Sequence, residues 1–499
     1  MKKSKGILMC ICVFSFFFLV AAMNPTLGTA AAPAKKAAPA KAAPKAGPAI
    51  ADMTVYPIKA KYDGTKLPDM SDFNIYDWPN PTGDTIKIAV VATFSGPAAL
   101  VGQGFWLNAT WAAHEINKKG GLFVDGKKKL IQLFKADTMS RPDQAKKICE
   151  QMVLQNGVKF LWGADGSPVV KVMYATASKY KVIAVNMISL SEDLQDANNW
   201  TPYVFSTWWQ TNMVGKSFAY FYSQRKKEKK FFLLNQDYLY GHQMADSFKA
   251  ALKEFYPEAQ VVGEDYHKIF NTDFAPYLTK IKASGAEVIF TGNWSVDADN
   301  LHKQARAMGM NIPIANIYLT NVTVMDEIGI KGTAGLQLAS PYAADNPMFK
   351  EPGYIKYYEA MWEAKKKFDK PPYNSVGFKA KPGWDPLSME FNWLCSVIER
   401  AKSVEADKII KVWEGDVYQY VNGHVVAMRA CDHQAIQTIH ILEQVPPDQQ
   451  KVMFNIPPYK WADTYSWYGP SFKVPEDKVL PWIDPNLGRC KGKKRTDIN

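Results

Sequence analysis

Few residue patterns in this 499-residue sequence are typical of an enzyme. The pairs Glu264-Asp265 and Asp432-His433 hold groups that could transfer protons, but no G-x-S-x-G motif surrounds a serine nucleophile. The seven histidines are scattered without an HExxH motif, and the cysteines lack the CxxC spacing of a metal site. We therefore predict that the protein is not an enzyme and has no cofactor and no bound metal.

Two turns are better suited to binding than to catalysis. The run Ile86–Ala92 is short, β-branched and nearly uncharged, which indicates a strand buried on both faces of a parallel sheet. Ser95-Gly96-Pro97 ends this strand and leaves a helix N-terminus at its carboxyl end, where open α/β sheets bind ligands. At the second turn, Ser167-Pro168 predicts a helix with serine at the N-cap and proline at the first position. Neither turn has a G-x-G-x-x-G or G-K-[ST] signature, so a nucleotide phosphate is not expected.

Short apolar runs and amphipathic stretches alternate along the rest of the chain. This pattern predicts an α/β fold with parallel sheets covered by helices on both faces, and the length favours two lobes. Strands are expected at residues 86–92, 129–134, 158–162, 182–186, 230–235, 287–291 and 335–338. Helices are expected at 108–118, 142–156, 241–255, 274–284 and 298–308, besides the one that Ser167-Pro168 begins.

The N-terminus has the form of a secretory signal peptide. A lysine-rich start at 2–5 precedes an apolar stretch at 7–23, and small residues follow at 28–31. We predict a signal peptide at 1–31, with an uncleaved membrane anchor as the alternative. Neither Cys10 nor Cys12 has the surroundings of a lipid-attachment cysteine. The expected product is therefore a soluble protein of the periplasm, where one or two disulfides are allowed among Cys149, Cys395, Cys431 and Cys490.

The net charge of +12 does not indicate a nucleic-acid partner, because most of it lies at the two ends of the chain. The first 50 residues contribute +7 and the tail at 489–499 contributes +4, which leaves +1 for the remainder. The Ala, Pro and Lys composition at 31–49 is typical of a semi-extended spacer, and we place the spacer and an N-terminal extension at 32–83.

Several motifs, in this order and spacing, together resemble the branched-chain amino acid type of periplasmic solute-binding protein. They are IKIAVVATFSGPAALVGQ at 86–103, Asp137 with the helix entry at 141–145, Gly163 with Ser167, the segment 237–241 and the late segment 423–434. The resemblance spans about 86–445. It implies the type I periplasmic binding protein fold, in which two doubly wound, Rossmann-like lobes are joined by three crossovers. Lobe 1 would take 84–207 and 336–435, lobe 2 would take 208–335 and 436–470, and a C-terminal extension with a basic tail would occupy 471–499.

The resemblance also implies a function without covalent chemistry. A small solute that touches both lobes favours their closed arrangement, and the loaded protein delivers it to the membrane permease of an ABC transporter. The expected state is a monomer, and ATP would be hydrolysed on the transporter. Two alternatives remain open, namely a ligand-binding sensor subunit for a signalling partner and, less favoured, an exported α/β enzyme. The pair Asp432-His433 is interpreted as structural in the resemblance.

The family pocket implies a set of ligand-binding residues in this sequence. Ser167 matches a serine that holds the ligand carboxylate, and the helix N-terminus there offers unpaired N–H groups and a favourable dipole. A simple N-cap is the alternative for this serine. The other matching positions could supply backbone, hydroxyl or aromatic contacts, or could merely be buried in the core: Asp165, Gly166, Met187, Ser189, Trp208, Tyr240, Trp294 and Tyr318.

One departure from the family leaves the class of solute open. Amino-acid binders of this family have a glutamate near the position of Tyr318, but residues 316–321 contain no acid. A buried ammonium without a carboxylate costs on the order of several kcal/mol. Asp165 and, less favoured, Asp237 are the candidate substitutes. An aromatic or apolar carboxylic acid therefore fits at least as well as an amino acid.

Overall fold

The computed structural model describes residues 56–318, 322–341, 351–368, 370–373, 386–444 and 471–499. The predicted signal peptide and the spacer up to residue 55 lie outside the described residues, as do residues 445–470 of the segment 436–470 assigned to lobe 2. The chain divides into the units Met1–Gly47 and Pro48–Asn499, and all of the described residues belong to the second. Within these residues, no helix combines the length and hydrophobicity that crossing a bilayer would require.

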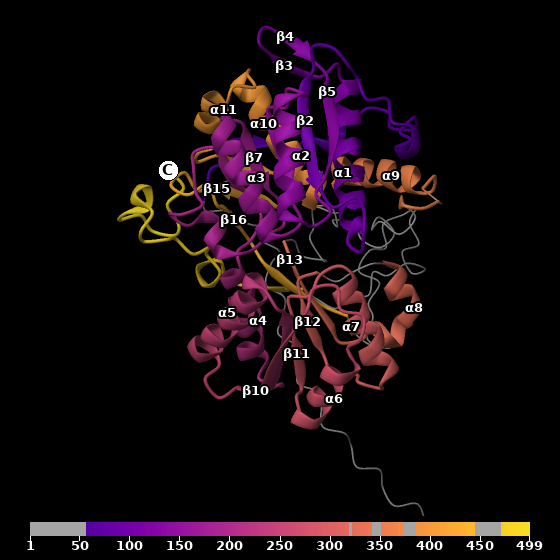
Figure 1. Cartoon of the computed structure of the whole chain (residues 1–499), viewed down its shortest axis with the longest axis vertical. Helices are drawn as coiled ribbons and strands as arrows, with labels where there is room; N and C mark the ends of the chain where they lie inside the picture. Colours follow the sequence, from indigo (N-terminus) through magenta and orange to yellow (C-terminus); the bar gives the residue numbers. More distant parts are fainter. Residues whose placement is uncertain (1–55, 319–321, 342–350, 369, 374–385, 445–470) are drawn as a thin grey trace, which may run out of the picture. The chain divides into compact units, whose positions relative to one another are not determined.

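The first α/β region is built on a five-stranded sheet that is parallel throughout, in the order β5-β2-β6-β7-β8 (Figure 1). In chain order this is the doubly wound arrangement 2-1-3-4-5, whose topological switch point lies between its first and third strands, β2 and β6. The strands are β2 (Ile86–Ala92), β5 (Ile131–Asp137), β6 (Phe160–Gly163), β7 (Ile183–Asn186) and β8 (Val204–Ser206).

Helices cover both faces of this sheet, which explains why its strands are apolar on both sides. One face packs against α2 (Pro142–Leu154) and α3 (Ser167–Tyr180), and Val91, Leu161 and Ala184 lie in that core. The other face packs against α1 (Ala99–Lys118), α10 (Pro386–Ala401) and α11 (Ala406–Trp413). The predicted α/β fold with parallel, doubly covered sheets is thus confirmed.

The second α/β region repeats this order and then adds two antiparallel strands. Its seven-stranded sheet runs β10-β9-β11-β12-β13-β17-β18, and the first five strands are parallel. The strands are β9 (Lys230–Gln236), β10 (Gln260–His267), β11 (Val288–Phe290), β12 (Ile314–Asn316), β13 (Leu336–Ser340), β17 (His440–Glu443) and β18 (Phe472–Lys473). The switch point of this sheet lies between β9 and β11.

Helices pack on both faces of the second sheet. On one side are α4 (Thr211–Arg225) and α5 (Leu239–Phe255), whose aromatic side chains share a core with Phe231, Leu233 and Phe290. On the other side are α6 (Ala275–Ser284) and α7 (Val296–Ala307). The helix α8 (Val322–Thr333) follows β12, and α9 (Pro352–Lys365) follows β13.

A third, four-stranded sheet is attached to the first region. It has the order β1-β14-β15-β16, and Met428 and Ala435 pack into the same core as β2 and β6. A bridge between Ser206 and Gln434 joins it to the end of β8. Its strands are β1 (Ala60–Lys61), β14 (Val417–Gln419), β15 (Val425–Met428) and β16 (Ala435–Gln437), while β3 (Leu122–Val124) and β4 (Lys127–Lys129) form a separate hairpin.

Some predicted boundaries differ from the structure. The first helix begins at Ala99 and not at residue 108, because Leu100 to Leu107 continue its buried face. Residues 336–340 were assigned to lobe 1, but β13 pairs with β12 and β17 and so belongs to the seven-stranded sheet. Similarly, β18 extends that sheet beyond residue 470. A short apolar run does not by itself specify which sheet receives it, since that depends on its hydrogen-bonding neighbours.

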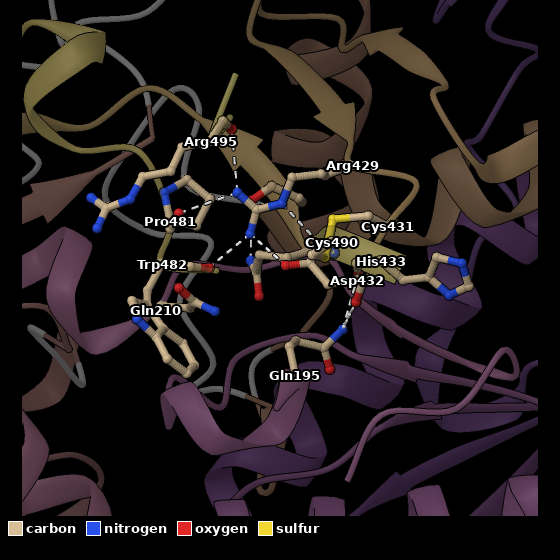
Figure 2. Close-up of polar contacts among 12 residues, drawn as sticks. Gln195, Gln210, Arg429, Cys431, Asp432, His433, Pro481, Trp482, Cys490 and Arg495 are labelled. Atoms are coloured by element: carbon tan, nitrogen blue, oxygen red, sulfur yellow. Dashed lines mark hydrogen bonds and ion pairs between the residues drawn. A yellow bond between two sulfur atoms is a disulfide. The ribbon is translucent and has the colours of Figure 1, made fainter. Parts of the chain in front are cut away.

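The C-terminal extension is anchored on the turn that precedes β16 (Figure 2). A disulfide joins Cys431 to Cys490 across 59 residues of sequence. Beside it, the fully buried Arg429 forms a two-pronged ion pair with Asp432, with N–O distances of 2.8 and 2.5 Å. Its guanidinium also donates to three backbone carbonyls of the extension, those of Pro481, Trp482 and Arg495. The buried positive charge of Arg429 is thus paired with a carboxylate, and its N–H groups donate hydrogen bonds to protein oxygens.

Candidate functional site

The first βα turn of each doubly wound sheet brings a helix close to the end of its strand. In α1, the backbone N–H of Gly102 donates to the carbonyl of Thr93, and a Cβ at Gly102 would lie 2.1 Å from that oxygen. In α5, a Cβ at Gly241 would lie 1.9 Å from the carbonyl oxygen of Gln236. Glycine is therefore required at both positions. The same close approach places both helix N-termini at the switch-point edges of their sheets.

Asp165 ties three loops together at the switch point of the first sheet. Its carboxylate accepts hydrogen bonds from the hydroxyls of Thr93, Thr138 and Ser140, which follow β2 and β5. Burial raises the pKa of Asp165, and the hydroxyl donors oppose that shift. Because both carboxylate oxygens of Asp165 already accept hydrogen bonds from these hydroxyls, a structural role in holding the three loops together accounts for this residue.

The neighbouring Asp137 organises the turn at Ser95-Gly96-Pro97. Its carboxylate accepts from the Ser95 hydroxyl at 2.7 Å and from the backbone N–H groups of Phe94 and Met139 at 2.9 and 3.0 Å. Burial alone would raise the pKa of Asp137, but these donors together lower it. The carboxylate therefore remains ionised at neutral pH and holds the turn in place.

Ser167 lies at the start of α3, but it is not the N-cap that the Ser-Pro pair predicted. Gly166 is the N-cap residue and makes no side-chain cap, so Ser167 is already the first helical residue. The buried Ser167 hydroxyl accepts a hydrogen bond from the Ser191 hydroxyl at 2.7 Å. This leaves the proton of Ser167 for donation, next to the unpaired N–H groups of the first helical turn.

The next two loops place the other predicted residues of this edge. Met187 follows β7 with its side chain in the hydrophobic core, which leaves only its backbone for a ligand. Ser189 is held by two hydrogen bonds between its backbone and the Asn186 side chain, at 3.0 and 2.7 Å. The Ser189 hydroxyl and the Trp208 indole N–H are buried, and neither has a hydrogen-bond partner in the described part of the chain.

The second edge carries the predicted aromatic residues. Tyr240 is buried in the core of the seven-stranded sheet, and its hydroxyl donates to the carbonyl of Gly292 at 2.9 Å. Packing therefore accounts for Tyr240 without a ligand. Trp294 is only half-buried, and its indole N–H donates to the hydroxyl of Tyr238 at 3.0 Å. Tyr318 is also half-buried and follows β12.

Hydrogen bonds and charges connect the two edges. The Tyr318 hydroxyl donates to the carbonyl of Ile188, in the loop after β7. The backbone N–H of Glu192 donates to the side chain of Gln243 on α5, at 3.1 Å. Burial raises the pKa of Tyr238, the hydrogen bond from Trp294 opposes that shift, and the charges of Asp297 and then of Asp165, on the opposite edge, raise the pKa further. The carboxyl ends of the parallel strands in the two sheets thus face one another, and the predicted site residues lie on both sides.

Sequence reasoning missed one buried acidic residue. Glu390 on α10 is 2% exposed. Burial raises the pKa of Tyr318, and the charges of Tyr238 and then Glu390 raise it further. Tyr238, whose hydroxyl accepts the hydrogen bond from the Trp294 indole, was also overlooked as a site residue. A signal for Glu390 was present in the sequence, because it is the only acid in a helical stretch that is otherwise apolar or neutral from residue 387 to 398. The other acidic candidate, Asp237, is exposed and accepts from His242 at 2.9 Å.

The groups that could have suggested catalysis are engaged elsewhere. Glu264 forms an ion pair with Lys249 at 2.8 Å, and Asp265 forms one with Lys280 at 2.5 Å. His433 lies between the carbonyl of Val204 and the Glu414 carboxylate, so it supports the turn as predicted. The described residues hold one group with the composition of a metal site, formed by Cys431, Asp432 and Cys490, but its sulfur atoms are joined in the disulfide.

Comparison with known proteins shows which family has this architecture. The sequence profile of the periplasmic binding protein family matches residues 85–450. The chain is similar to a protein of Brucella melitensis named Leu/Ile/Val-binding protein homolog 3, at 28% identity over 227 residues. That alignment covers 45% of this chain and 59% of the relative, so the chain spans about three fifths of the relative's length.

Solved structures share the fold at lower sequence identity. A periplasmic binding protein from Burkholderia mallei superposes with a TM-score of 0.64 at 20% identity, over 82% of this chain and all of that one. A solute-binding protein of an ABC transporter from Rhodopseudomonas palustris HaA2, crystallised with p-hydroxybenzoic acid, gives 0.62 at 19% identity, over 79% and 98%. The fold is the type I periplasmic binding protein fold, and the family consists of binding proteins and not enzymes. With its profile match over most of its length, this chain belongs to the periplasmic binding protein family.

Proposed function

We propose that this protein captures a small carboxylate-bearing solute between its two lobes and delivers it to the permease of an ABC transporter. The observation that carries the proposal is the pairing of the two switch-point edges, which the hydrogen bond from Tyr318 to Ile188 connects. Doubly wound sheets bind ligands at this position. Two such edges that face one another can contact one solute from both sides.

The carboxylate of the solute would bind at the start of α3. Ser167 has a hydroxyl proton to donate, and the first turn of the helix adds unpaired N–H groups and the positive end of the helix dipole. The Ser189 hydroxyl is a second donor without a partner in the described residues. These groups favour a negatively charged oxygen over a neutral one.

The body of the solute would pack against the aromatic residues around this position. Trp294 and Tyr318 are half-buried on the second edge, and Trp208 supplies an indole N–H without a described partner on the first. Aromatic surfaces of this kind suit an apolar or aromatic solute. The Leu/Ile/Val-binding name of the Brucella melitensis relative and the p-hydroxybenzoic acid in the Rhodopseudomonas palustris structure both support this class of solute.

Transport requires no covalent step on this chain. A solute that contacts both edges stabilises the arrangement in which they meet, and only this difference in affinity shifts the population towards it. The permease would then recognise the loaded form. The protein would work in the periplasm as a monomer after removal of the export segment at 1–31.

The test is a binding panel with a matched pair of variants. Protein purified without refolding is analysed by native mass spectrometry for retained solute, and then titrated with aliphatic amino acids, aromatic amino acids and benzoic acids. Ser167→Ala should weaken binding by about 10-fold or more, since a hydrogen bond to a charged group is lost. The control is Ser178→Ala on the same helix, whose hydroxyl donates to the Tyr174 carbonyl and contacts Thr201. Absence of binding across the panel, with no retained solute, would refute the proposal.

A further inference from the structure

The C-terminal extension at 471–499 makes a further connection between the two α/β regions. The chain also passes from one region to the other after β8, after β13 and after β16. The extension begins on the second region and ends on the first. Because the family profile ends at residue 450, this connection lies outside the part of the chain that matches the family.

The start of the extension is built into the second region. Its strand β18 pairs with β17 of the seven-stranded sheet, and the Val474 N–H donates to the carbonyl of Ile439 at 3.0 Å. The ring of Phe472 lies 5.4 Å from that of Phe221 on α4. Val474 and Val479 are buried in the core that α4 and α5 share with this sheet. This part of the extension therefore moves with the second region.

The rest of the extension is held by the first region and its attached third sheet. Leu480 packs against the core on the third sheet, and Ile498 is buried in the same core. The carboxylate of Asp484 accepts from the backbone N–H of Ala197 at 2.8 Å. Near the end of the chain, the N–H of Ala430 donates to the carbonyl of Ile498 at 2.9 Å. These contacts fix both ends of the segment 480–498 on the first region.

A buried arginine and a covalent bond secure this attachment (Figure 2). Arg429 donates to the carbonyls of Pro481 and Trp482 at 3.2 and 2.8 Å, immediately after the point where the extension reaches the first region. The disulfide between Cys431 and Cys490 then ties the extension to the same turn. Thermal motion cannot detach a covalent anchor, so the extension stays on the first region when the two regions move.

The passage between the regions has no slack, because Val479 and Leu480 are consecutive residues with anchors on different regions. Val479 is 1% exposed in the core of the second region, whereas Leu480 packs on the third sheet. Consecutive Cα atoms are about 3.8 Å apart. While both anchors hold, the regions cannot separate at this point. Any opening must therefore turn about this point as well as about the other passages.

We propose that the extension is a strap that limits how far the two regions open in the protein without solute. A further fixed point removes open arrangements that the other passages alone would allow. A narrower set of open arrangements lowers the ordering cost of bringing both regions onto a solute. The strap acts on the chain itself, so its test depends neither on the proposed function nor on the class of solute.

The experiment measures the distance between the two facing edges by pulsed electron paramagnetic resonance. Spin labels are attached at Met139→Cys and Ile269→Cys, two exposed positions in the loops after β5 and β10. The full-length protein is dialysed to remove solute. Cys149 and Cys395 are buried and stay unlabelled. The labelled protein with an otherwise unchanged sequence gives the reference distribution of distances.

The test variant adds slack and keeps every anchor. Six Gly and Ser residues inserted between Val479 and Leu480 span about 13 Å as a flexible linker. The long-distance side of the distribution should extend by about 5 Å or more. The matched control has the same insertion between Gly492 and Lys493, two exposed residues whose neighbouring anchors, at Cys490 and Ile498, both lie on the first region. This control should give the reference distribution.

A second variant keeps the length of the chain. Replacing Cys431 and Cys490 by serine leaves only noncovalent anchors on the first region, so the distribution should broaden in part. Thermal unfolding shows whether each variant is folded, and the serine variant decides if the insertion prevents folding. A reference distribution in the folded Val479–Leu480 insertion variant, or equal broadening in both insertion variants, would overturn the strap. An unchanged distribution in the serine variant would overturn it where the insertion variant does not fold.

Discussion

Replacing Cys431 and Cys490 together by serine tests how the C-terminal extension contributes to stability. The disulfide closes a loop across 59 residues, for which the loss of chain entropy in the unfolded state corresponds to about 4 kcal/mol at 25 °C. The double variant should lose about this amount of unfolding free energy. The entropy of unfolding is about 2.1 cal/mol/K per residue, or about 0.9 kcal/mol/K for about 450 residues. Dividing the lost free energy by this entropy gives an expected fall in Tm of about 4 °C.

The assay is thermal unfolding by calorimetry, with and without a reductant. Reductant should lower the Tm of the wild type to that of the double variant and should not change the variant further. The two free cysteines of the described residues provide no competing reaction, because Cys149 and Cys395 are buried and burial raises the pKa of the Cys149 thiol to about 12. A change in Tm below about 1 °C would show that the extension is held by its other contacts and would refute the estimate. A reductant effect that persists in the variant would refute the assigned pairing.

Two further changes test buried charges. Arg429→Met should lower the free energy of unfolding, measured in urea, by about 3–5 kcal/mol, since Asp432 loses its partner and the carbonyls of the extension lose their donor. Adding Asp432→Asn should restore part of this free energy. A loss below about 1 kcal/mol in Arg429→Met would contradict the reasoning. His302 is fully buried, and burial followed by the charge of Arg306 lowers its pKa to about 3. In the unfolded chain this histidine takes up a proton near pH 6.5, whereas in the folded protein it stays neutral down to about pH 3. The free energy of unfolding therefore decreases as the pH falls below about 6.5, by about 2 kcal/mol at pH 5. Stability curves in urea should show this slope in the wild type and a smaller one in His302→Leu, whereas identical slopes would contradict it.

Much of the local structure could be predicted from the residue pattern. The central strands of the two parallel sheets, such as β2, β6, β7, β9 and β11, are mostly runs of apolar, β-branched or aromatic residues, and parallel strands covered on both faces require that composition. The turns after β2 and β6 could also be recognised from their glycine and serine residues, because a helix can begin close to the end of a strand only where the side chains are small. The boundaries were less certain, as the early start of α1 shows, since its first two turns are as apolar as a strand.

The candidate site could be predicted only in part. Ser167, Ser189, Trp294 and Tyr318 lie on the two facing edges, as the resemblance implied, and their role in binding stays a prediction. Asp165 reaches the same place but is engaged by three hydroxyls from neighbouring loops. Glu390 was overlooked because more than 70 residues separate it from Tyr318, and no local pattern connects the two.

The sequence by itself determined the alternation of strands and helices, the form of an export segment and the family, because burial and turn chemistry act between residues that are near in the chain. The tertiary structure decided which sheet receives β13, that Cys431 pairs with Cys490, and that Tyr318 donates a hydrogen bond to Ile188 in the opposite loop. The physical reason is the same in each case. Partners in a sheet, a disulfide or an electrostatic contact are chosen by distance in space, and the fold brings together residues whose separation in sequence carries no information about that distance.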